Sequence, residues 1–170
     1  MMKTAIVGSH STWKSTLLDA IETTTPKLKE VAREVIQVFW KSPQEMTHQE
    51  RVAFQSNVYS NQVLYEKELW EFISDRSIYD NLAYAYHTDK ELYKALSAHA
   101  KNNHKWYDNV IYIPIEFWLE NDWVRFTWDE FQKQVDDTIK MILKEFWVDY
   151  KTITWSVDER VQQVNSILWQ

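Results

Sequence analysis

The chain is poor in glycine, cysteine and long hydrophobic runs. It contains one glycine among 170 residues, although average usage is about 7%. The absence of cysteine excludes disulfide bonds and catalysis by a thiol. No uninterrupted apolar run approaches the ~18 residues that a membrane-spanning helix needs. We therefore expect a cytoplasmic protein with no membrane segment.

Length and charge limit the organisation and the partners of the chain. A length of 170 residues predicts one domain, residues 1–170, with room for a sizeable core. The sequence enters its first predicted strand directly, so we expect no signal peptide. The net charge is −6 and no stripe of lysine and arginine is present. This balance argues against a nucleic-acid partner, a polynucleotide 5′ end included.

The segment Lys3–Leu18 carries the most specific motif. A short apolar run typical of a buried strand precedes Gly8, and a helix-forming run follows Ser15. A phosphate-binding loop has the pattern G-x-x-x-x-G-K-[ST] between a strand and a helix. Gly8, Lys14 and Ser15 match this pattern, whereas Trp13 stands where the second glycine is expected. The segment therefore predicts a P-loop with one departure.

The chemistry of phosphate binding explains these residue types. Backbone N–H groups and the positive end of the following helix surround the phosphates of a nucleotide. Lys14 is expected to reach the β- and γ-phosphates, and Ser15 to give its hydroxyl to Mg²⁺. We thus predict ATP or GTP and Mg²⁺ as cofactors, bound by the loop residues Gly8, Ser9, His10, Ser11, Thr12, Trp13, Lys14, Ser15 and Thr16.

Tryptophan is abundant, with ten residues, and several stand where glycine is expected. Trp40 and Trp147 follow helix-like runs, at positions where many helices end in a left-handed residue. Trp123 replaces the glycine of an Asp-Gly turn, and Trp155 stands between a predicted strand and a predicted helix. Some bacterial lineages read the codon UGA as glycine. We hypothesise that most of these positions are glycine in the natural protein; the alternative is a naturally tryptophan-rich protein with an aromatic core or a carbohydrate-binding face.

Strand and helix patterns alternate along the whole chain. Five strands are predicted at residues 5–7, 29–35, 71–75, 109–115 and 151–154, and the second is also compatible with the start of a helix. Such alternation predicts an α/β fold in which a parallel sheet carries helices on both faces. Ligands of these sheets bind beyond the carboxyl ends of the strands. The P-loop, Arg33, Asp75, Arg76 and residues 116–125 are therefore expected at one edge.

The order of the motifs resembles a known family. The P-loop is followed by EVAREVI, ISDRSIYDNLAY, YDNVIYIPIEF and NDWVRFTWDEFQ. Together they are similar to the P-loop kinase-like AAA domains grouped with the ribosylnicotinamide kinase region of bacterial NAD regulators, and more distantly to thymidylate and other nucleoside or nucleotide kinases. The resemblance spans essentially the whole chain. It implies a P-loop NTPase three-layer sandwich with a five-stranded parallel sheet.

The resemblance also implies roles for individual residues. Asp75 is expected to orient an acceptor hydroxyl or to bind the water shell of Mg²⁺, the alternative being a helix-capping residue. Arg76 is expected to contact phosphate, unless it forms an ion pair with Asp80. Arg125 is placed on a lid of about residues 116–127 that closes over the phosphates, or else is a solvated loop residue. With Lys14, these residues form the expected catalytic set.

Acceptor binding is assigned to the region after the second strand. The resemblance implies that Glu30 and Arg33 hold the acceptor, and Glu116 is a weaker candidate. The metal ligands are then Ser15 and Asp75. His10 lies at a variable position of the loop, and a role as a specific ligand is not expected for it.

These inferences predict a phosphotransferase that moves the γ-phosphate of ATP or GTP to a small nucleoside- or nucleotide-like hydroxyl acceptor. An indole at position 13 is expected to weaken or abolish nucleotide binding, because the loop backbone must approach the phosphates closely. The alternatives are a nucleotide-binding regulatory ATPase without a small-molecule acceptor, or a scaffold that binds no nucleotide. The sequence does not identify the acceptor.

Overall fold

The computed structural model describes residues 2–102, 107–116 and 126–168, with the side chains of 126–129 excluded. Five strands and seven helices alternate along the chain. Their bounds are β1 Lys3–Val7, α1 Lys14–Ala20, β2 Lys27–Leu28, α2 Val31–Phe39, α3 His48–Glu68, β3 Phe72–Asp75, α4 Ile78–Thr88, α5 Lys90–Lys101, β4 Asn109–Tyr112, α6 Phe126–Glu145, β5 Lys151–Thr152 and α7 Val157–Leu168.

All strands belong to one parallel sheet with the order β2-β3-β1-β4-β5. Side chains alternate between its faces because the period of a strand is two residues. Ala5 and Val7 of β1 face one layer of helices, and Ile6 between them faces the other. The near-continuous apolar runs of β1 and β4 follow from this burial on both sides.

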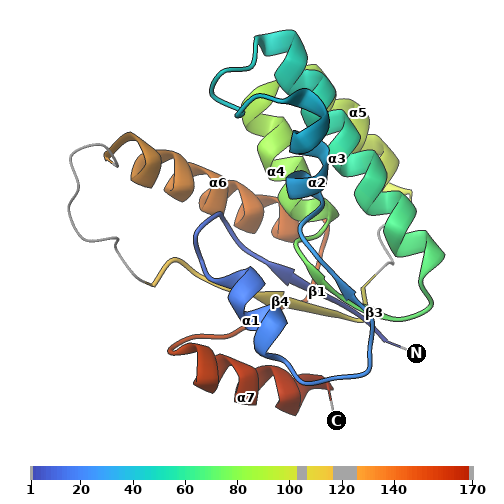
Figure 1. Ribbon diagram of the computed structural model, residues 1–170, viewed down its shortest axis with the longest axis vertical. Coiled ribbons are helices and arrows are strands. Elements are labelled where there is room, and N and C mark those ends of the chain that lie inside the picture. The colour runs from blue at the N-terminus through green and yellow to red at the C-terminus, as the bar shows by residue number, and fades with distance from the viewer. Residues whose placement is uncertain (1, 103–106, 117–125, 169–170) are drawn as a thin grey trace.

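Helices cover both faces of the sheet (Figure 1). Apolar side chains of α3, α4, α5 and α6 pack on one face, whereas α1 and α7 pack on the other. Helix α2 packs against α3 through a smaller cluster that includes Val35 and Phe54. The predicted three-layer α/β sandwich with a five-stranded parallel sheet is thereby confirmed.

The second strand is the main difference from the expected elements. Residues 29–35 were compatible with a strand or with a helix start, and the structure makes Val31–Phe39 a helix, with only Lys27–Leu28 in the sheet. Glu30 caps this helix and therefore lies at the carboxyl edge of the sheet, directly after β2. Pairing of β2 with the buried strand β3 fixes this position.

Two helix ends agree with the expected turn chemistry. Trp40 ends α2 with φ 53°, and Trp147 follows α6 with φ 54°. Both lie in the left-handed region that glycine usually fills at helix ends. Among the described helices none is long and apolar enough to cross a lipid bilayer.

Candidate active site

The P-loop begins at a position that only glycine fits. Gly8 follows β1 with φ 151°, and a Cβ there would lie 2.6 Å from the backbone oxygen of Ile113. Its N–H donates to Asp80 Oδ1 at 3.0 Å. Because β4 runs beside β1 in the sheet, the loop has to leave the sheet past the Ile113 carbonyl. Close backbone approach, rather than turn propensity, sets the need for glycine.

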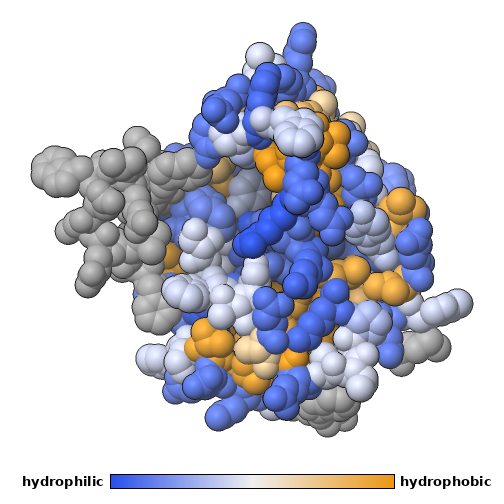
Figure 2. Space-filling view, in the orientation of Figure 1, coloured by the Kyte–Doolittle hydropathy of each residue, from blue (hydrophilic) through white to orange (hydrophobic). Residues whose placement is uncertain are grey.

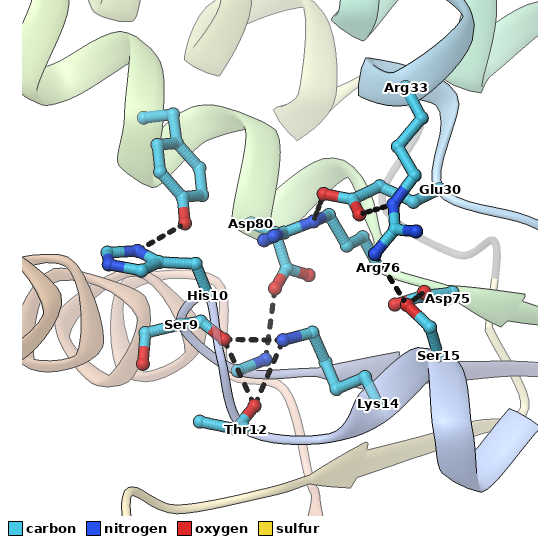
Figure 3. Close-up of polar contacts among 12 residues, drawn as sticks. Ser9, His10, Thr12, Lys14, Ser15, Glu30, Arg33, Asp75, Arg76 and Asp80 are labelled. Carbon is cyan, nitrogen blue, oxygen red and sulfur yellow. Dashed lines mark hydrogen bonds and ion pairs between the residues drawn. The ribbon is translucent and has the colours of Figure 1, made fainter. Parts of the chain in front are cut away.

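Lys14 lies inside the loop that precedes it (Figure 3). Its Nζ donates to Ser9 O at 2.5 Å and to Thr12 Oγ1 at 3.0 Å. The side chain is buried. Burial and the nearby charge of Arg76 lower the pKa of Lys14 to about 8. The ammonium group is therefore aimed at the concave side of the loop, where a phosphate is bound in P-loops.

Trp13 adopts the backbone conformation expected of the missing glycine. It is the residue before α1, with φ 68° and ψ 21°, and its side chain caps no backbone group. The indole is 53% exposed. A left-handed conformation costs a non-glycine residue about 1–2 kcal/mol. The loop thus keeps the path of a P-loop at the expense of strain at Trp13.

Ser15 and Asp75 form the candidate magnesium pair. The Ser15 hydroxyl donates to Asp75 Oδ2, because β3 lies beside β1 and ends next to the start of α1. Asp75 is buried, and its Oδ1 has no hydrogen-bond partner among the described residues. Mg²⁺ is commonly held by one hydroxyl, one carboxylate, phosphate oxygens and water. This pair fits that set, and the unpartnered carboxylate oxygen is a free ligand atom.

Glu30 links two arginines at the same edge (Figure 3). Arg76 Nε donates to Glu30 Oε1 at 2.6 Å, and Arg33 Nε donates to Glu30 Oε2 at 2.8 Å. Burial alone raises the pKa of Glu30, but Arg76 and the hydrogen bonds from both arginines outweigh it, so the pKa is lowered. Glu30 is therefore a carboxylate at neutral pH. Arg33 also reaches Ser15, with its Nη2 at 3.5 Å from the hydroxyl.

Arg76 has an unusual backbone for a residue with a side chain. Its φ is 81°, and its N–H donates to Ile6 O at 2.9 Å. The guanidinium lies over the ring of Tyr84, 5.2 Å from the centroid. Such strained residues are concentrated at functional sites. Here the backbone turn directs the arginine from the end of β3 toward Glu30 instead of toward solvent.

A cavity of about 640 Å³ opens beside these residues. Its volume is in the range of small-molecule sites. Glu30 and Arg76 line it at the end near the P-loop, together with His10. Helices α3, α4 and α6 complete the wall with Phe54, Val58, Asn81, Tyr84 and Phe131, among others. On the face shown in Figure 2, hydrophilic side chains gather between the upper helices and α1, and apolar side chains lie below them in the view.

His10 connects the P-loop to this cavity. Its Nδ1 lies 3.1 Å from the Tyr84 hydroxyl, and its ring stacks on Phe131. Its carbonyl accepts a hydrogen bond from Gln132 Nε2 at 2.6 Å. Burial, with the charges of Arg76 and Lys14, lowers the pKa of His10 to about 4. A neutral imidazole therefore stands between the two parts of the site.

The structure brings most of the predicted site residues together at the carboxyl edge of the sheet. Lys14, Ser15, Glu30, Arg33, Asp75 and Arg76 all lie there. Among the described residues, Arg76 forms its ion pair with Glu30 instead of with the alternative partner Asp80. Arg125, Trp123 and most of the expected lid (117–125) lie outside the described residues.

Glu116 lies behind the loop instead of in the cavity. Arg160 Nη2 donates to Glu116 Oε2 at 2.6 Å, and Arg160 Nη1 donates to Thr12 O at 3.0 Å. The backbone N–H of Trp155 also donates to the Glu116 carboxylate. Arg160 is 1% exposed. This ion pair fixes the outer side of the P-loop, which is a structural role.

Asp80 and Arg160 hold the P-loop in place, and sequence reasoning assigned this role to neither residue. Asp80 is fully buried and accepts hydrogen bonds from Gly8 N, Ser77 N and Ser77 Oγ, so it ties the P-loop to the start of α4. Its spacing from Ser77, three residues, is the signal of a capping box, which hides its second role. Arg160 gave no signal, because an arginine in the first turns of a C-terminal helix reads as a surface residue.

A known protein family and several solved structures match this chain. The profile of a family described as an AAA domain matches residues 3–160. Deoxyadenosine kinase from M. mycoides has a TM-score of 0.73 at 16% identity, over 98% of both chains. The NadR protein in complex with NR has a TM-score of 0.73 at 17% identity, over 98% of this chain and 50% of that chain. Thymidylate kinase from Ehrlichia chaffeensis has a TM-score of 0.62 at 16% identity, over 98% of both chains.

No curated protein sequence matches the chain. The matching family and structures confirm the resemblance predicted from the motifs: the fold is that of P-loop nucleoside and nucleotide kinases.

Proposed function

The chain belongs to this AAA domain family, and from that premise we propose that it transfers the γ-phosphate of ATP or GTP to a hydroxyl of a small nucleoside- or nucleotide-like acceptor. One observation carries the proposal. The P-loop, with Lys14 and the Ser15–Asp75 pair, lies beside a cavity whose nearest charged residues are Glu30 and Arg76. A phosphate donor and an acceptor of small-molecule size can thus meet at one edge of the sheet.

The donor side holds and neutralises the triphosphate. Backbone N–H groups of the loop surround the β-phosphate, and Lys14 exchanges its bonds to Ser9 and Thr12 for phosphate oxygens. Ser15 and Asp75 would hold Mg²⁺, which supplies charge neutralisation between the β- and γ-phosphates. Release of Lys14 from the loop is favourable with an anion, because no carboxylate of the described residues lies at hydrogen-bond distance from its buried charge.

The acceptor side positions the attacking hydroxyl. The hydroxyl oxygen bonds to the γ-phosphorus while the bond from phosphorus to the β–γ bridging oxygen breaks, and the hydroxyl proton passes to a carboxylate. We assign this carboxylate to Glu30, because it is ionised and lines the cavity, whereas Asp75 is engaged with Ser15. Arg76 stabilises the charge that develops on the transferring phosphoryl group. Arg125 stays a prediction for the same task.

Trp13 is expected to hinder nucleotide binding by the P-loop. The natural glycine of a P-loop lets the backbone N–H groups approach phosphate, and an indole adds bulk at that point. The chain as written is therefore proposed to bind nucleotide weakly or not at all. Trp13→Gly restores the pattern without altering any side chain of the acceptor cavity.

The test is phosphotransfer by the Trp13→Gly variant with Mg·ATP and a panel of nucleosides and nucleoside monophosphates. We expect transfer to at least one of these acceptors and loss of transfer in Trp13→Gly/Lys14→Met. Trp13→Gly/Lys94→Met, which removes an exposed lysine of α5, is the matched control and is expected to be unchanged. Folded protein that binds Mg·ATP but transfers phosphate to no acceptor would contradict the proposal, and slow hydrolysis unaffected by acceptors would favour the regulatory ATPase.

A further inference from the structure

The acceptor cavity contains two buried donor groups with no partner. Asn81 lies in the first turn of α4 and is 2% exposed, and Arg76 is 8% exposed. Within the described part of the chain, Asn81 Nδ2 and Arg76 Nη1 form no hydrogen bond. Both residues line the cavity. Buried amide and guanidinium donors are almost always satisfied, because they have given up their bonds to water.

The neighbouring wall is apolar and aromatic. Phe54 and Val58 from α3, Tyr84 from α4 and Phe131 from α6 surround the same space. Tyr84 and Phe131 are in ring contact with each other and with His10. A flat heterocycle fits such a wall, since its faces pack on aromatic rings and its edge carries nitrogen or oxygen atoms that accept hydrogen bonds.

The charges of the cavity indicate how the acceptor is oriented. Glu30 is nearest the P-loop and is held as a carboxylate by Arg76 and Arg33. The lining also carries Arg33, Arg51 and Arg76, but Glu30 is its carboxylate, so this end of the cavity can accept the proton of a hydroxyl. The reactive end is therefore an alcohol, and the unpartnered amide of Asn81 is left for another part of the molecule.

We propose that Asn81 is a specificity-determining residue of the acceptor site. Its Nδ2 donates to a hydrogen-bond-accepting atom of a nucleoside heterocycle, while the sugar hydroxyl lies at Glu30. Arg76 Nη1 donates to the sugar or to the transferring phosphoryl group. This inference rests on the proposed function, in that it names the acceptor class of the same site as nucleosides.

Calorimetric binding of ribonucleosides and deoxyribonucleosides to the full chain tests the inference without any nucleotide donor. We expect at least one nucleoside to bind, its 5′-monophosphate to bind more weakly, and Asn81→Asp to weaken the nucleoside at least tenfold. Asn57→Asp makes the same change on the exposed face of α3, where Asn57 Nδ2 donates to Ala53 O, and is expected to bind like the parent. Asn81→Asp keeps the shape of the side chain and removes its donors.

A purely structural role for Asn81 would not change selectivity. The nucleoside is therefore compared with its analogue that lacks the accepting ring atom. The parent chain is expected to prefer the nucleoside, and Asn81→Asp to lose that preference. Unchanged affinity and preference in Asn81→Asp would overturn the inference, as would tighter binding of the monophosphate. Absence of phosphotransfer, measured separately, overturns the proposed function and not this assignment.

A second inference comes from the backbone at the tryptophans. The structure describes the side chains of five of them, and four have φ between 53° and 81°: Trp13, Trp40, Trp147 and Trp155. No tyrosine or phenylalanine among the described residues has a positive φ. The four indoles are 53–94% exposed, so they contribute little to the core. Large exposed aromatics do not select left-handed turns, whereas glycine does.

We infer that these four positions are glycine in the protein that its own cells make, through reading of UGA as glycine. Peptide mass spectrometry of protein purified from those cells is the direct test. Glycine masses at positions 13, 40, 147 and 155, with UGA in the gene, are the expected result. Tryptophan masses or UGG codons at these positions would overturn the inference.

Stability provides an independent measurement on recombinant protein. Trp147→Gly and Trp40→Gly are expected to raise Tm, because the left-handed turn no longer strains a side chain. Trp70→Gly is the matched control: Trp70 is equally exposed but has no positive φ, and its replacement is expected not to raise Tm. A Tm that falls in Trp147→Gly and Trp40→Gly would contradict the assignment of these turns to glycine.

Discussion

The candidate site has a donor half, the P-loop, and an acceptor half, the cavity beside it, and the two are built from different parts of the chain. The donor half is mainly one contiguous loop, in which Lys14 folds back onto the Ser9 carbonyl and the Thr12 hydroxyl. The acceptor half consists of side chains from α2, α3, α4 and α6, far apart in the sequence. A single bulky residue therefore harms the first half at Trp13, but leaves the second half intact. The chain thus presents a formed acceptor cavity beside a strained donor loop.

Glu30→Gln in the Trp13→Gly background is expected to have the largest effect, because it damages the acceptor half and leaves the donor half intact. The amide cannot take the hydroxyl proton, and general-base groups commonly contribute about 10²–10⁴-fold to rate. We expect kcat to fall by this factor while Mg·ATP affinity stays unchanged. Glu34→Gln, on the exposed side of the same helix, is the control. An equal loss of Mg·ATP affinity in Glu30→Gln would place Glu30 in the donor half.

Gly8→Ala is the reciprocal change, which damages only the donor half. The added Cβ meets Ile113 O at 2.6 Å, at a φ that side chains rarely adopt. In the Trp13→Gly background we expect Mg·ATP affinity to fall at least about 100-fold, which corresponds to ~3 kcal/mol. Calorimetry measures the affinity, with Ser60→Ala on the exposed side of α3 as control. Nucleoside binding that falls in parallel would show that the two halves are not independent.

Glu66, which lies outside both halves, is expected to make the stability of the fold depend on pH. Glu66 is buried and accepts hydrogen bonds from Tyr107, whose hydroxyl accepts from Ile78 N at the start of α4. Burial raises the pKa of Glu66 to about 7. The folded state then holds a proton that the unfolded state releases near pH 4.5. Stability therefore falls as pH rises through about 4.5 to 7, by about 3 kcal/mol.

Denaturant unfolding across this pH range measures the effect of Glu66. Glu66→Gln is expected to flatten the dependence, because an amide does not titrate, whereas Glu68→Gln, exposed two residues further along α3, is expected to keep it. A parent chain whose stability does not change between pH 4.5 and 7 would show that Glu66 is ionised in the folded state.

The smallest expected effect is a pH dependence confined to the donor half. Burial and Arg76 lower the pKa of Lys14 to about 8, so the ammonium group loses its proton above that pH. In the Trp13→Gly variant, Mg·ATP affinity should fall about fivefold from pH 8 to pH 9, or ~1 kcal/mol, because Lys14 is already half deprotonated at pH 8. Lys14→Arg keeps its charge and should remove this dependence. A nucleoside affinity that changes equally over the same range would assign the titration elsewhere.

The same contrast explains what the sequence could predict. The P-loop was predicted because its groups are contiguous, and strand, loop and helix carry a fixed spacing. The sheet was predicted because strands buried on both faces are near-continuous apolar runs. Arg33, Asp75 and Arg76 were placed at one edge because parallel strands end together. Each of these signals is local or follows from the sheet order.

The acceptor cavity was not predicted, for a physical reason. Asn81, Tyr84 and Phe131 converge only through the packing of α4 and α6 on the sheet, and each looks like an ordinary helix residue in the sequence. Asp80 was hidden by its capping box, and Arg160 by its place near the start of the last helix. The second strand was predicted at residues 29–35, whereas β2 is Lys27–Leu28. The charged segment after β2 has no clear apolar period that could have separated strand from helix. The position of Glu30 therefore had to come from the structure.

The central claim is that this chain has a P-loop whose nucleotide binding is limited by Trp13. The most direct measurement is Mg·ATP calorimetry on the chain and on Trp13→Gly, side by side, with folding checked by circular dichroism. We predict binding by the glycine variant at an affinity at least about 100-fold higher than that of the chain, a difference of ~3 kcal/mol. Equal binding by both would show that the loop accepts an indole, and no binding by either folded protein would contradict the assignment of the P-loop itself.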